Sequence, residues 1–382
     1  MIAFLIANLD VRGGTHKQFL KLLEYTEAQG EPFYIITMRV DFDKTYPGFR
    51  KYGHLIRIFE REPKTSSNPI ARYRRLKRNC RKLAGLLKDA DVANLHDCGF
   101  DGYLPAFGGI RTVWQINDLN PAFRTGVAAK SNDTIGKWLS RKLFLHNLKA
   151  IDKITVNVTK NAECIKDKLH RDAEVLYCGI EPLGIERPIE ESLKRFEHKK
   201  INLLSSGVWF PYRNYETQVE VVKELLDRGY DVQLDIIGTT QYSPEYHEKI
   251  QHLINDGKLN DRIRIRGMVD ENEFRQLHMQ SDIFLFINVD QSWGLAVFEA
   301  MSCALPVIVS ESVGATEILH DGVDSVFVNP LSVRDITDQI IALTSDSDKY
   351  RQLSATASEF HHSYTWDKAY SSKMLSILTT CK

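Results

Sequence analysis

Residues 282–311 read "DIFLFINVDQSWGLAVFEAMSCALPVIVSE" and hold a strand, a helix and a second strand in close succession. The apolar run 283–288 predicts a buried strand, the run that begins at Gly294 predicts a helix to about residue 304, and 306–310 predicts another buried strand. Strands without polar alternation are typical of a parallel sheet that helices cover on both faces. The stretch therefore predicts one unit of a parallel α/β sheet.

The same alternation of strand and helix repeats along the chain, with one interruption. Residues 181–200 contain two prolines, a glycine and many charges, and we expect them to form a linker. Repeated strand, helix, strand units with right-handed crossovers predict doubly wound open sheets. Apolar runs that read as strands on both sides of the interruption include 2–8, 32–38, 92–96, 111–117, 201–207, 232–238 and 262–267.

The fold prediction is therefore α/β, with two Rossmann-like doubly wound domains of residues 1–184 and 185–365. Ligands of such sheets bind at the carboxyl ends of the strands, which favours a site in a cleft where the two domains face each other. A chain of 382 residues with 43% hydrophobic and 26% charged residues is long enough for two cores.

Composition excludes several other classes. The six cysteines show neither C-x-x-C pairs nor histidine spacing, so neither a disulfide framework nor a zinc site is indicated. No segment approaches the roughly 20 apolar residues of a membrane span, and the apolar start lacks a basic leader, so it reads as a first strand. We expect a cytoplasmic protein.

A net charge of zero hides an asymmetry. Residues 1–184 hold 30 of the 50 Lys and Arg but 20 of the 50 Asp and Glu. The segment 71–88 is basic and has apolar residues at helical spacing, and 134–149 repeats the pattern. Three interpretations remain for such a helix: a solvated surface, an anionic membrane or acceptor, and nucleic acid. We expect no nucleic acid, and a peripheral contact with an anionic membrane through Arg74, Arg75, Arg78 and Arg81.

Two loops at predicted strand ends have residues suited to a ligand. "SSGVWFPYRNYE" combines Gly207, where a backbone can approach a ligand, with Arg213 at the start of a helix, which favours phosphate; a surface ion pair is the alternative. In the second loop Gly294 precedes a helix that carries Glu299. Glu299 either accepts hydrogen bonds from ligand hydroxyls or only stabilises the helix start.

The block "DIFLFINVDQSWGLAVFEAMSCALPVIVSESVGATEILHDGVDSVFVNP" resembles the E-x7-E loop and helix, the "G-x-P-V-I" strand and the "G-G-x-x-E" turn of a known family. This is the large family of retaining glycosyltransferases with the GT-B architecture, family 4, also called glycosyl transferases group 1. The resemblance covers about residues 200–335, and is looser for "VRGGTHKQF", "VANLH" and "WQINDLN". "SYTWDKAY" resembles the start of a C-terminal helix, here about 366–382, that packs back onto the first domain.

The resemblance implies a nucleotide-sugar donor site. Glu299 would bind ribose hydroxyls, Gly294 and Leu295 would offer backbone N–H groups, and Arg213 would neutralise the diphosphate. The nucleobase would lie near Gly238, Met268 and Val269, and Gly13 and Gly14 would approach the phosphates from the other domain. The donor-binding residues implied are Gly13, Gly14, Gly207, Arg213, Gly238, Met268, Val269, Gly294, Leu295 and Glu299.

The sequence departs from the family at three places. The first acid of E-x7-E is Gln291, a common arginine is Val208, and a common histidine is replaced by Asn117 followed by Asp118. We expect His96, Asp118 and Gln291 at the reacting groups and Asn117 at the acceptor. For His96 and Asp118 a structural role remains the alternative. A glutamine can still hydrogen-bond a sugar, but it removes a negative charge near a developing oxocarbenium ion.

The expected function is transfer of a hexosyl unit, with retention, from a nucleoside-diphosphate sugar to a hydroxyl of a glycan or lipid-linked acceptor, in surface polysaccharide biosynthesis. We expect no cofactor and no metal, because no D-x-D stands in a suitable loop. The alternatives are a non-catalytic nucleotide-sugar-binding subunit and a nucleotide-sugar epimerase. A dehydrogenase is disfavoured because no G-x-G-x-x-G with a following acid occurs.

Overall fold

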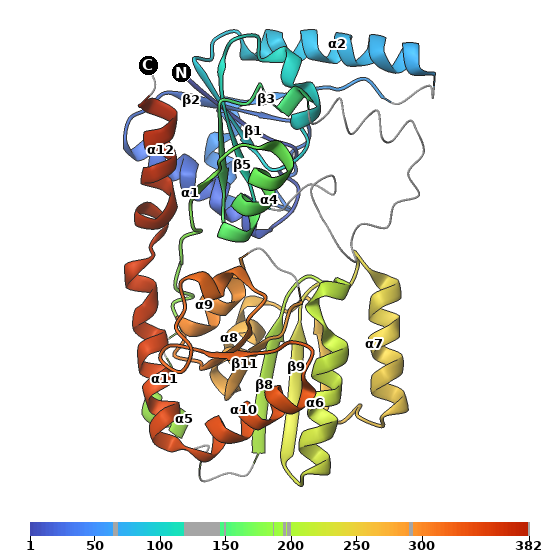
Figure 1. Ribbon diagram of the computed structural model, residues 1–382, viewed down its shortest axis with the longest axis vertical. Helices are drawn as coiled ribbons and strands as arrows, with labels where there is room; N and C mark the ends of the chain where they lie inside the picture. Colours follow the sequence, from blue (N-terminus) through green and yellow to red (C-terminus); the bar gives the residue numbers. More distant parts are fainter. Residues whose placement is uncertain are drawn as a thin grey trace. The chain divides into compact units, whose positions relative to one another are not determined.

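The chain forms two compact units in the computed structural model (Figure 1). The N-terminal unit comprises residues 1–179 and 366–382, and the C-terminal unit comprises residues 180–365. The structure describes residues 1–63, 68–117, 146–148, 150–185, 187–193, 196, 200–289 and 293–380. The basic stretch 134–149, Asp118 and Gln291 therefore lie wholly or mostly outside the described residues.

The N-terminal unit is built on a seven-stranded sheet of order β3-β2-β1-β4-β5-β6-β7, in which every pair is parallel. All residues of β1, β2 and β4 are buried, including Asn94 and His96 of β4. The last helix, α12, packs against α1 (Figure 1). The elements are β1 (Ile2–Ile6), α1 (Gly14–Ala28), β2 (Phe33–Thr37), β3 (Ile56–Ile58), α2 (Pro69–Leu87), β4 (Val92–His96), β5 (Arg111–Ile116), β6 (Lys153–Val156), α4 (Thr159–Leu169), β7 (Glu174–Val175) and α12 (Ser372–Thr379).

The C-terminal unit is built on a six-stranded parallel sheet of order β10-β9-β8-β11-β12-β13. Figure 1 shows helices on both sides of this sheet, with α8 and α9 on one side and α6 on the other. The elements are α5 (Ile189–Leu193), β8 (Lys200–Ser206), α6 (Tyr215–Asp227), β9 (Asp231–Ile237), α7 (Pro244–Asp256), β10 (Ile263–Gly267), α8 (Glu271–Gln280), β11 (Ile283–Phe286), α9 (Leu295–Met301), β12 (Val307–Ser310), β13 (Val326–Val328), α10 (Val333–Ser345) and α11 (Ser347–Phe360).

Both sheets have a topological switch point, where the order of the strands reverses. In the N-terminal unit it lies between β1 and β4, and in the C-terminal unit between β8 and β11. The loops that leave these strands at their carboxyl ends open to either side of the switch point, which is where doubly wound sheets bind ligands. The prediction of two doubly wound parallel sheets is confirmed. The loops at the two switch points are therefore the candidate ligand-binding loops.

The linker prediction for residues 181–200 is wrong for the part that surrounds Arg187. The division between the units falls at Gly179, a few residues before the predicted boundary. Arg187 is buried in the C-terminal unit, where its guanidinium donates to the carbonyl oxygens of Ala304 and Ser281 at 3.2 and 2.6 Å and to the Tyr350 hydroxyl at 3.2 Å. Prolines and charge density suggested a solvated connection, but this arginine finds acceptors inside the unit.

Candidate functional site

Arg213 is held at the carboxyl end of β8. Its side chain is only 8% exposed, Nε donates to the carbonyl oxygen of Val208 at 3.1 Å, and the guanidinium lies 5.5 Å from the ring centroid of Phe286. Gly207 makes this position possible, because a Cβ built there would stand 2.5 Å from Cζ of Arg213. The backbone carbonyl of Val208 is thus the acceptor that orients the Arg213 side chain.

Gly207 and Gly238 follow β8 and β9, and they let the backbone segments at these two strand ends approach each other closely. The N–H of Gly207 donates to the Ile237 carbonyl at 3.0 Å, and a Cβ on Gly238 would collide with the Gly207 carbonyl oxygen. Gly238 has φ = 133° and donates from its N–H to the Gly267 carbonyl at 2.8 Å. Beyond Gly267, Met268 is 76% exposed, an apolar side chain open to solvent at this sheet edge.

Gly294 turns the chain from β11 into α9. It has φ = 105°, a left-handed conformation that favours glycine, and a Cβ there would lie 2.8 Å from Cε1 of Phe286. Helix α9 begins at Leu295, the next residue, and no side chain caps it. The buried ring of Phe286 therefore lies in contact with both Arg213 and Gly294, and it brings these two predicted donor-site residues together.

Glu299 lies half-buried on the second turn of α9. Its backbone carbonyl accepts from the Ser302 hydroxyl at 2.7 Å. Burial lowers the pKa of nearby His278, and both the hydrogen bond to the Phe274 carbonyl and the Glu299 carboxylate act in the opposite direction. The Glu299 carboxylate therefore favours the protonated form of His278. Its predicted partner in the motif, Gln291, lies outside the described residues.

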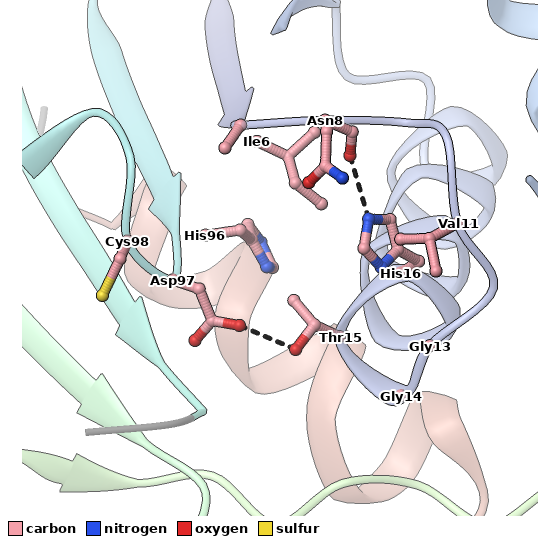
Figure 2. Close-up of a pocket in the computed structure, with 11 residues that line it drawn as sticks. Ile6, Asn8, Val11, Gly13, Gly14, Thr15, His16, His96, Asp97 and Cys98 are labelled. Atoms are coloured by element: carbon pink, nitrogen blue, oxygen red, sulfur yellow. Dashed lines mark hydrogen bonds between the residues drawn. The ribbon is translucent and has the colours of Figure 1, made fainter. Parts of the chain in front are cut away.

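A pocket opens at the switch point of the N-terminal unit, with a volume of about 270 Å³ (Figure 2). It is lined by residues that follow β1, by the start of α1 and by the end of β4. Gly13, the N-cap of α1, and Gly14, its first residue, both line it, and no side chain caps this helix. The lining residues are Ile6, Ala7, Asn8, Val11, Gly13, Gly14, Thr15, His16, His96, Asp97 and Cys98.

His96 ends β4 and is 1% exposed, with its ring edge-on to Phe19 at 4.7 Å between centroids. Burial, together with nearby His16, lowers the pKa of His96 to about 3, so the imidazole is neutral at ordinary pH. Neither ring nitrogen has a hydrogen-bond partner among the described residues. A buried imidazole without partners is unfavourable, since each unsatisfied polar atom costs about 1–3 kcal/mol.

Asp97, the next residue, is fixed from several directions. Its Oδ2 accepts from the Thr15 hydroxyl at 2.7 Å, and its Oδ1 accepts from the backbone N–H of Asn117 at 2.7 Å. Its carbonyl oxygen accepts from Trp114 Nε1 at 2.7 Å. The residue has φ = 51°, an uncommon conformation for a side chain other than glycine, which this surrounding network maintains.

Asn117 belongs to the same network and not to the pocket lining. Its Nδ2 donates to Gln18 Oε1 at 2.7 Å and to the Thr15 hydroxyl at 3.2 Å, and its Oδ1 accepts from Gln115 Nε2 at 2.9 Å. The amide is therefore engaged within the unit, where it supports Thr15 and, through its backbone, Asp97. Asp118, which follows it, lies outside the described residues.

Sequence reasoning missed four residues of these sites: Phe286, Thr15, His16 and Asp97. Asp97 could have been found, because it directly follows the strand-end His96 that the sequence singled out. Thr15 and His16 lie in the first turn of α1, directly after Gly13 and Gly14, so the sequence could have predicted them as well. Phe286 has no signal, because it reads as one more apolar residue of a buried strand.

The basic helix α2 (Pro69–Leu87) is exposed at its start and has buried leucines towards its end. Leu83 and Leu87 are buried, whereas Ile70 and Tyr73 in its first turns are 64% and 66% exposed. Of the predicted arginines, Arg78 pairs with Glu62 at 2.8 Å and Arg75 donates to the Pro63 carbonyl at 3.3 Å. Arg74 and Arg81 are exposed. The start of α2 therefore presents positive charge and apolar surface together.

In the described part of the chain, no group of three or more His, Cys, Asp and Glu side chains is arranged to hold a metal ion. Nor is any helix there long and apolar enough to cross a membrane.

Comparison with known proteins gives one family. The family model "Glycosyl transferases group 1" matches residues 186–360. The phosphatidylinositol N-acetylglucosaminyltransferase GPI3 subunit of Saccharomyces cerevisiae is 22% identical over 267 residues, which cover 68% of this chain and 55% of that protein. D-inositol 3-phosphate glycosyltransferase of Paenarthrobacter aurescens is 23% identical, over 52% of this chain and 51% of that protein. The chain spans about half the length of these curated relatives.

Solved structures match over almost the whole chain. Anabaena HepE in complex with UDP has a TM-score of 0.77 and 12% identity, over 99% of both chains. WaaG, a glycosyltransferase involved in lipopolysaccharide biosynthesis, has a TM-score of 0.70 and 15% identity, over 99% of this chain and 100% of that one. At these identities the likeness shows the fold. Residues 186–360 therefore match the glycosyl transferases group 1 family, and the fold of the chain is GT-B.

Proposed function

We propose that the chain transfers a hexosyl unit from a nucleoside-diphosphate sugar to a hydroxyl of a glycan or lipid-linked acceptor. The observation that carries this proposal is the meeting of Arg213 and Gly294 around Phe286, with Glu299 on the helix that Gly294 begins. A buried guanidinium and the N–H groups of a helix start that no side chain caps suit a diphosphate, and a carboxylate suits ribose hydroxyls. The family of residues 186–360 supports the same chemistry.

Each donor-site residue then has a role. Arg213 binds the diphosphate, the N–H groups after Gly294 bind its oxygens or the sugar, and Glu299 accepts from the ribose. Gly207 and Gly238 have no side chain, so the nucleotide can approach the backbone at the carboxyl ends of β8 and β9. The nucleobase lies at Met268 and Val269. Gly13 and Gly14 of the N-terminal unit approach the phosphates. The UDP bound to Anabaena HepE supports this donor class.

The reaction proposed proceeds with retention and without a metal. The bond between the anomeric carbon and the diphosphate oxygen breaks, and the acceptor oxygen bonds to the same face of that carbon. The diphosphate takes the acceptor's proton. Arg213 and the start of α9 stabilise the charge that develops on the diphosphate. His96 orients the acceptor as a neutral imidazole, and Asp118 and Gln291 contact the reacting sugar and acceptor.

We further place the acceptor at an anionic membrane, with a role in surface polysaccharide biosynthesis. The exposed Ile70 and Tyr73 lie next to Arg74 at the start of α2, and the exposed Arg81 follows further along the same helix. These residues support an interfacial contact, because apolar side chains enter the headgroup region while arginines attract anionic lipid. The likeness to WaaG supports a glycan acceptor.

A thermal-shift panel of UDP, GDP, ADP, dTDP and CMP with their sugar conjugates tests the donor site. We expect one nucleotide to raise the melting temperature of the wild type, and the shift to disappear in Glu299→Ala. Glu311→Ala removes an exposed carboxylate of the same unit and serves as the control, which should keep the shift. Stabilisation by no nucleotide would remove the basis of the proposal. Binding without sugar transfer or donor turnover would favour the non-catalytic alternative.

A further inference from the structure

Tyr212 lies beside the buried Arg213 guanidinium, in the loop between β8 and α6. Cζ of Arg213 stands 5.3 Å from the centroid of the Tyr212 ring and 5.5 Å from the centroid of the Phe286 ring. Both distances fall within the roughly 6 Å over which an aromatic ring attracts a cation. Arg213 thus has one aromatic partner in its own loop and a second one at the end of β11.

The Tyr212 ring is itself held in place. The Phe210 ring stacks on it, with 5.6 Å between the centroids and 20° between the planes. Pro211 begins the short 3₁₀ turn Pro211–Arg213, and the N–H of Arg213 closes this turn by donating to the Phe210 carbonyl at 2.9 Å. Proline restricts φ to the value that such a turn needs. Tyr212 and Arg213 are therefore neighbours in one rigid turn.

The backbone of Tyr212 joins this turn to the other loop of the candidate donor site. Its carbonyl oxygen accepts from the N–H of Val289 at 2.9 Å, and Val289 lies between β11 and Gly294. Only main-chain atoms form this bond, so a substitution of Tyr212 can keep it. The contribution of the ring can therefore be separated from the contribution of the loop.

The ring supplies what the hydrogen bond of Arg213 does not. Nε donates to the Val208 carbonyl at 3.1 Å, which fixes one edge of the guanidinium. An aromatic neighbour acts on the plane of the group as well, because a guanidinium is planar and packs on ring faces. A fork that is oriented in advance loses less side-chain freedom when it binds the oxygens of a phosphate. Tyr212 therefore favours an Arg213 that is ready for an anion.

We propose that Tyr212 is a positioning residue for the diphosphate, whose ring holds the Arg213 guanidinium in the orientation that binds phosphate oxygens. This inference rests on the proposed function and adds to it a residue that acts through Arg213. The phosphate part of the nucleotide affinity then depends on an aromatic side chain at position 212. The nucleoside part, which Glu299, Met268 and Val269 bind, does not depend on it.

Calorimetric titration of the full chain with UDP, GDP, ADP, dTDP and CDP identifies the diphosphate that binds, and displacement titration measures the matching nucleoside. The ratio of the two dissociation constants isolates the phosphates. In Tyr212→Leu the diphosphate should bind about fivefold more weakly and the nucleoside as in the wild type, because leucine fills space but does not attract a cation. Tyr212→Phe keeps the ring and should keep the ratio. An unchanged ratio in Tyr212→Leu, or an equal loss in Tyr212→Phe, would overturn the role.

A second background shows whether the ring acts through Arg213. In Arg213→Met, the further change Tyr212→Leu should leave the ratio as it is, because both residues serve one contact. Losses that add up would overturn the proposal. Tyr230→Leu is the control: it removes a half-buried ring next to the amino end of β9 and should keep the wild-type ratio.

The outcome for the wild type separates this inference from the proposed function. If none of the five diphosphates binds to the wild type, the proposed function fails and the role of Tyr212 fails with it. If one binds and Tyr212→Leu keeps the wild-type ratio, only the role of Tyr212 fails.

Discussion

Arg213 packs directly on Gly207: a Cβ at Gly207 would stand 2.5 Å from the guanidinium carbon. The Arg213 side chain is held in this position, because its Nε donates to the Val208 carbonyl and its guanidinium lies over the Phe286 ring. Gly207→Ala should therefore displace the arginine without removing its charge, and weaken nucleoside diphosphate binding about tenfold, or about 1.4 kcal/mol. Calorimetric titration measures this. Gly85→Ala, on α2 with open space around it, is the control, and equal affinity of both variants would contradict the placement of Arg213.

The two buried histidines of the N-terminal pocket predict a loss of stability in acid. The pKa of His96 falls from 6.5 to about 3 on folding, so between these values the unfolded chain binds a proton that the folded chain does not. Stability is therefore full above about pH 6.5 and falls as the pH drops towards 3, with a slope of up to about 1.4 kcal/mol per pH unit. Denaturant unfolding from pH 4 to 7 should show a smaller slope for His96→Leu. Equal slopes would show that His96 does not titrate as a buried group.

The exposed start of α2 predicts binding to anionic vesicles. Reversing Arg74 and Arg81 to Glu should weaken sedimentation with phosphatidylglycerol vesicles at least thirtyfold, because each basic residue near such a surface contributes about 1 kcal/mol. Tyr73→Ser should weaken it as well, and the residual binding should fall with added salt. The matched control reverses Lys223 and Arg264, exposed residues of the C-terminal unit. If both double variants bind equally, α2 is a solvated surface.

Arg187 predicts a large contribution to the stability of the C-terminal unit. Replacing it with Met leaves the carbonyl oxygens of Ser281 and Ala304 and the Tyr350 hydroxyl without this donor. Unfolding in urea should show a loss of about 3 kcal/mol or more, since each buried acceptor left unsatisfied costs about 1–3 kcal/mol. Arg187→Lys should recover only part, because an ammonium cannot reproduce the planar fork. If Arg187→Met left the free energy of unfolding unchanged, water would have to replace the guanidinium as the donor to these acceptors.

The parallel sheets could be predicted because most of their strands are mainly apolar runs that alternate with helices along the chain. Gly294 and the start of α9 were equally visible, since a glycine before a helical run is a local signal. The contacts around Phe286 were not, because they depend on β8 lying beside β11, a pairing that hydrophobic periodicity does not specify. The burial of Arg187 was hidden for a similar reason: its acceptors lie about a hundred residues further along the chain.

The sequence predicted part of the N-terminal pocket, namely Gly13, Gly14 and His96. His96 was singled out from its place at a strand end, but its missing partners appear only with the packing around it. The acceptor role of Asn117 stays a prediction, and its amide is bonded to Gln18, Thr15 and Gln115 within the unit. A role for Asn117 in holding Thr15 and Asp97 in place follows from these bonds.

The most direct test of the donor site is a crystal structure of the chain with the nucleoside diphosphate that the thermal-shift panel identifies. We expect ribose hydroxyls on the Glu299 carboxylate and the diphosphate beside Arg213, over the first N–H groups of α9. A nucleotide bound elsewhere, without contact to Glu299 and Arg213, would overturn the assignment of the donor site.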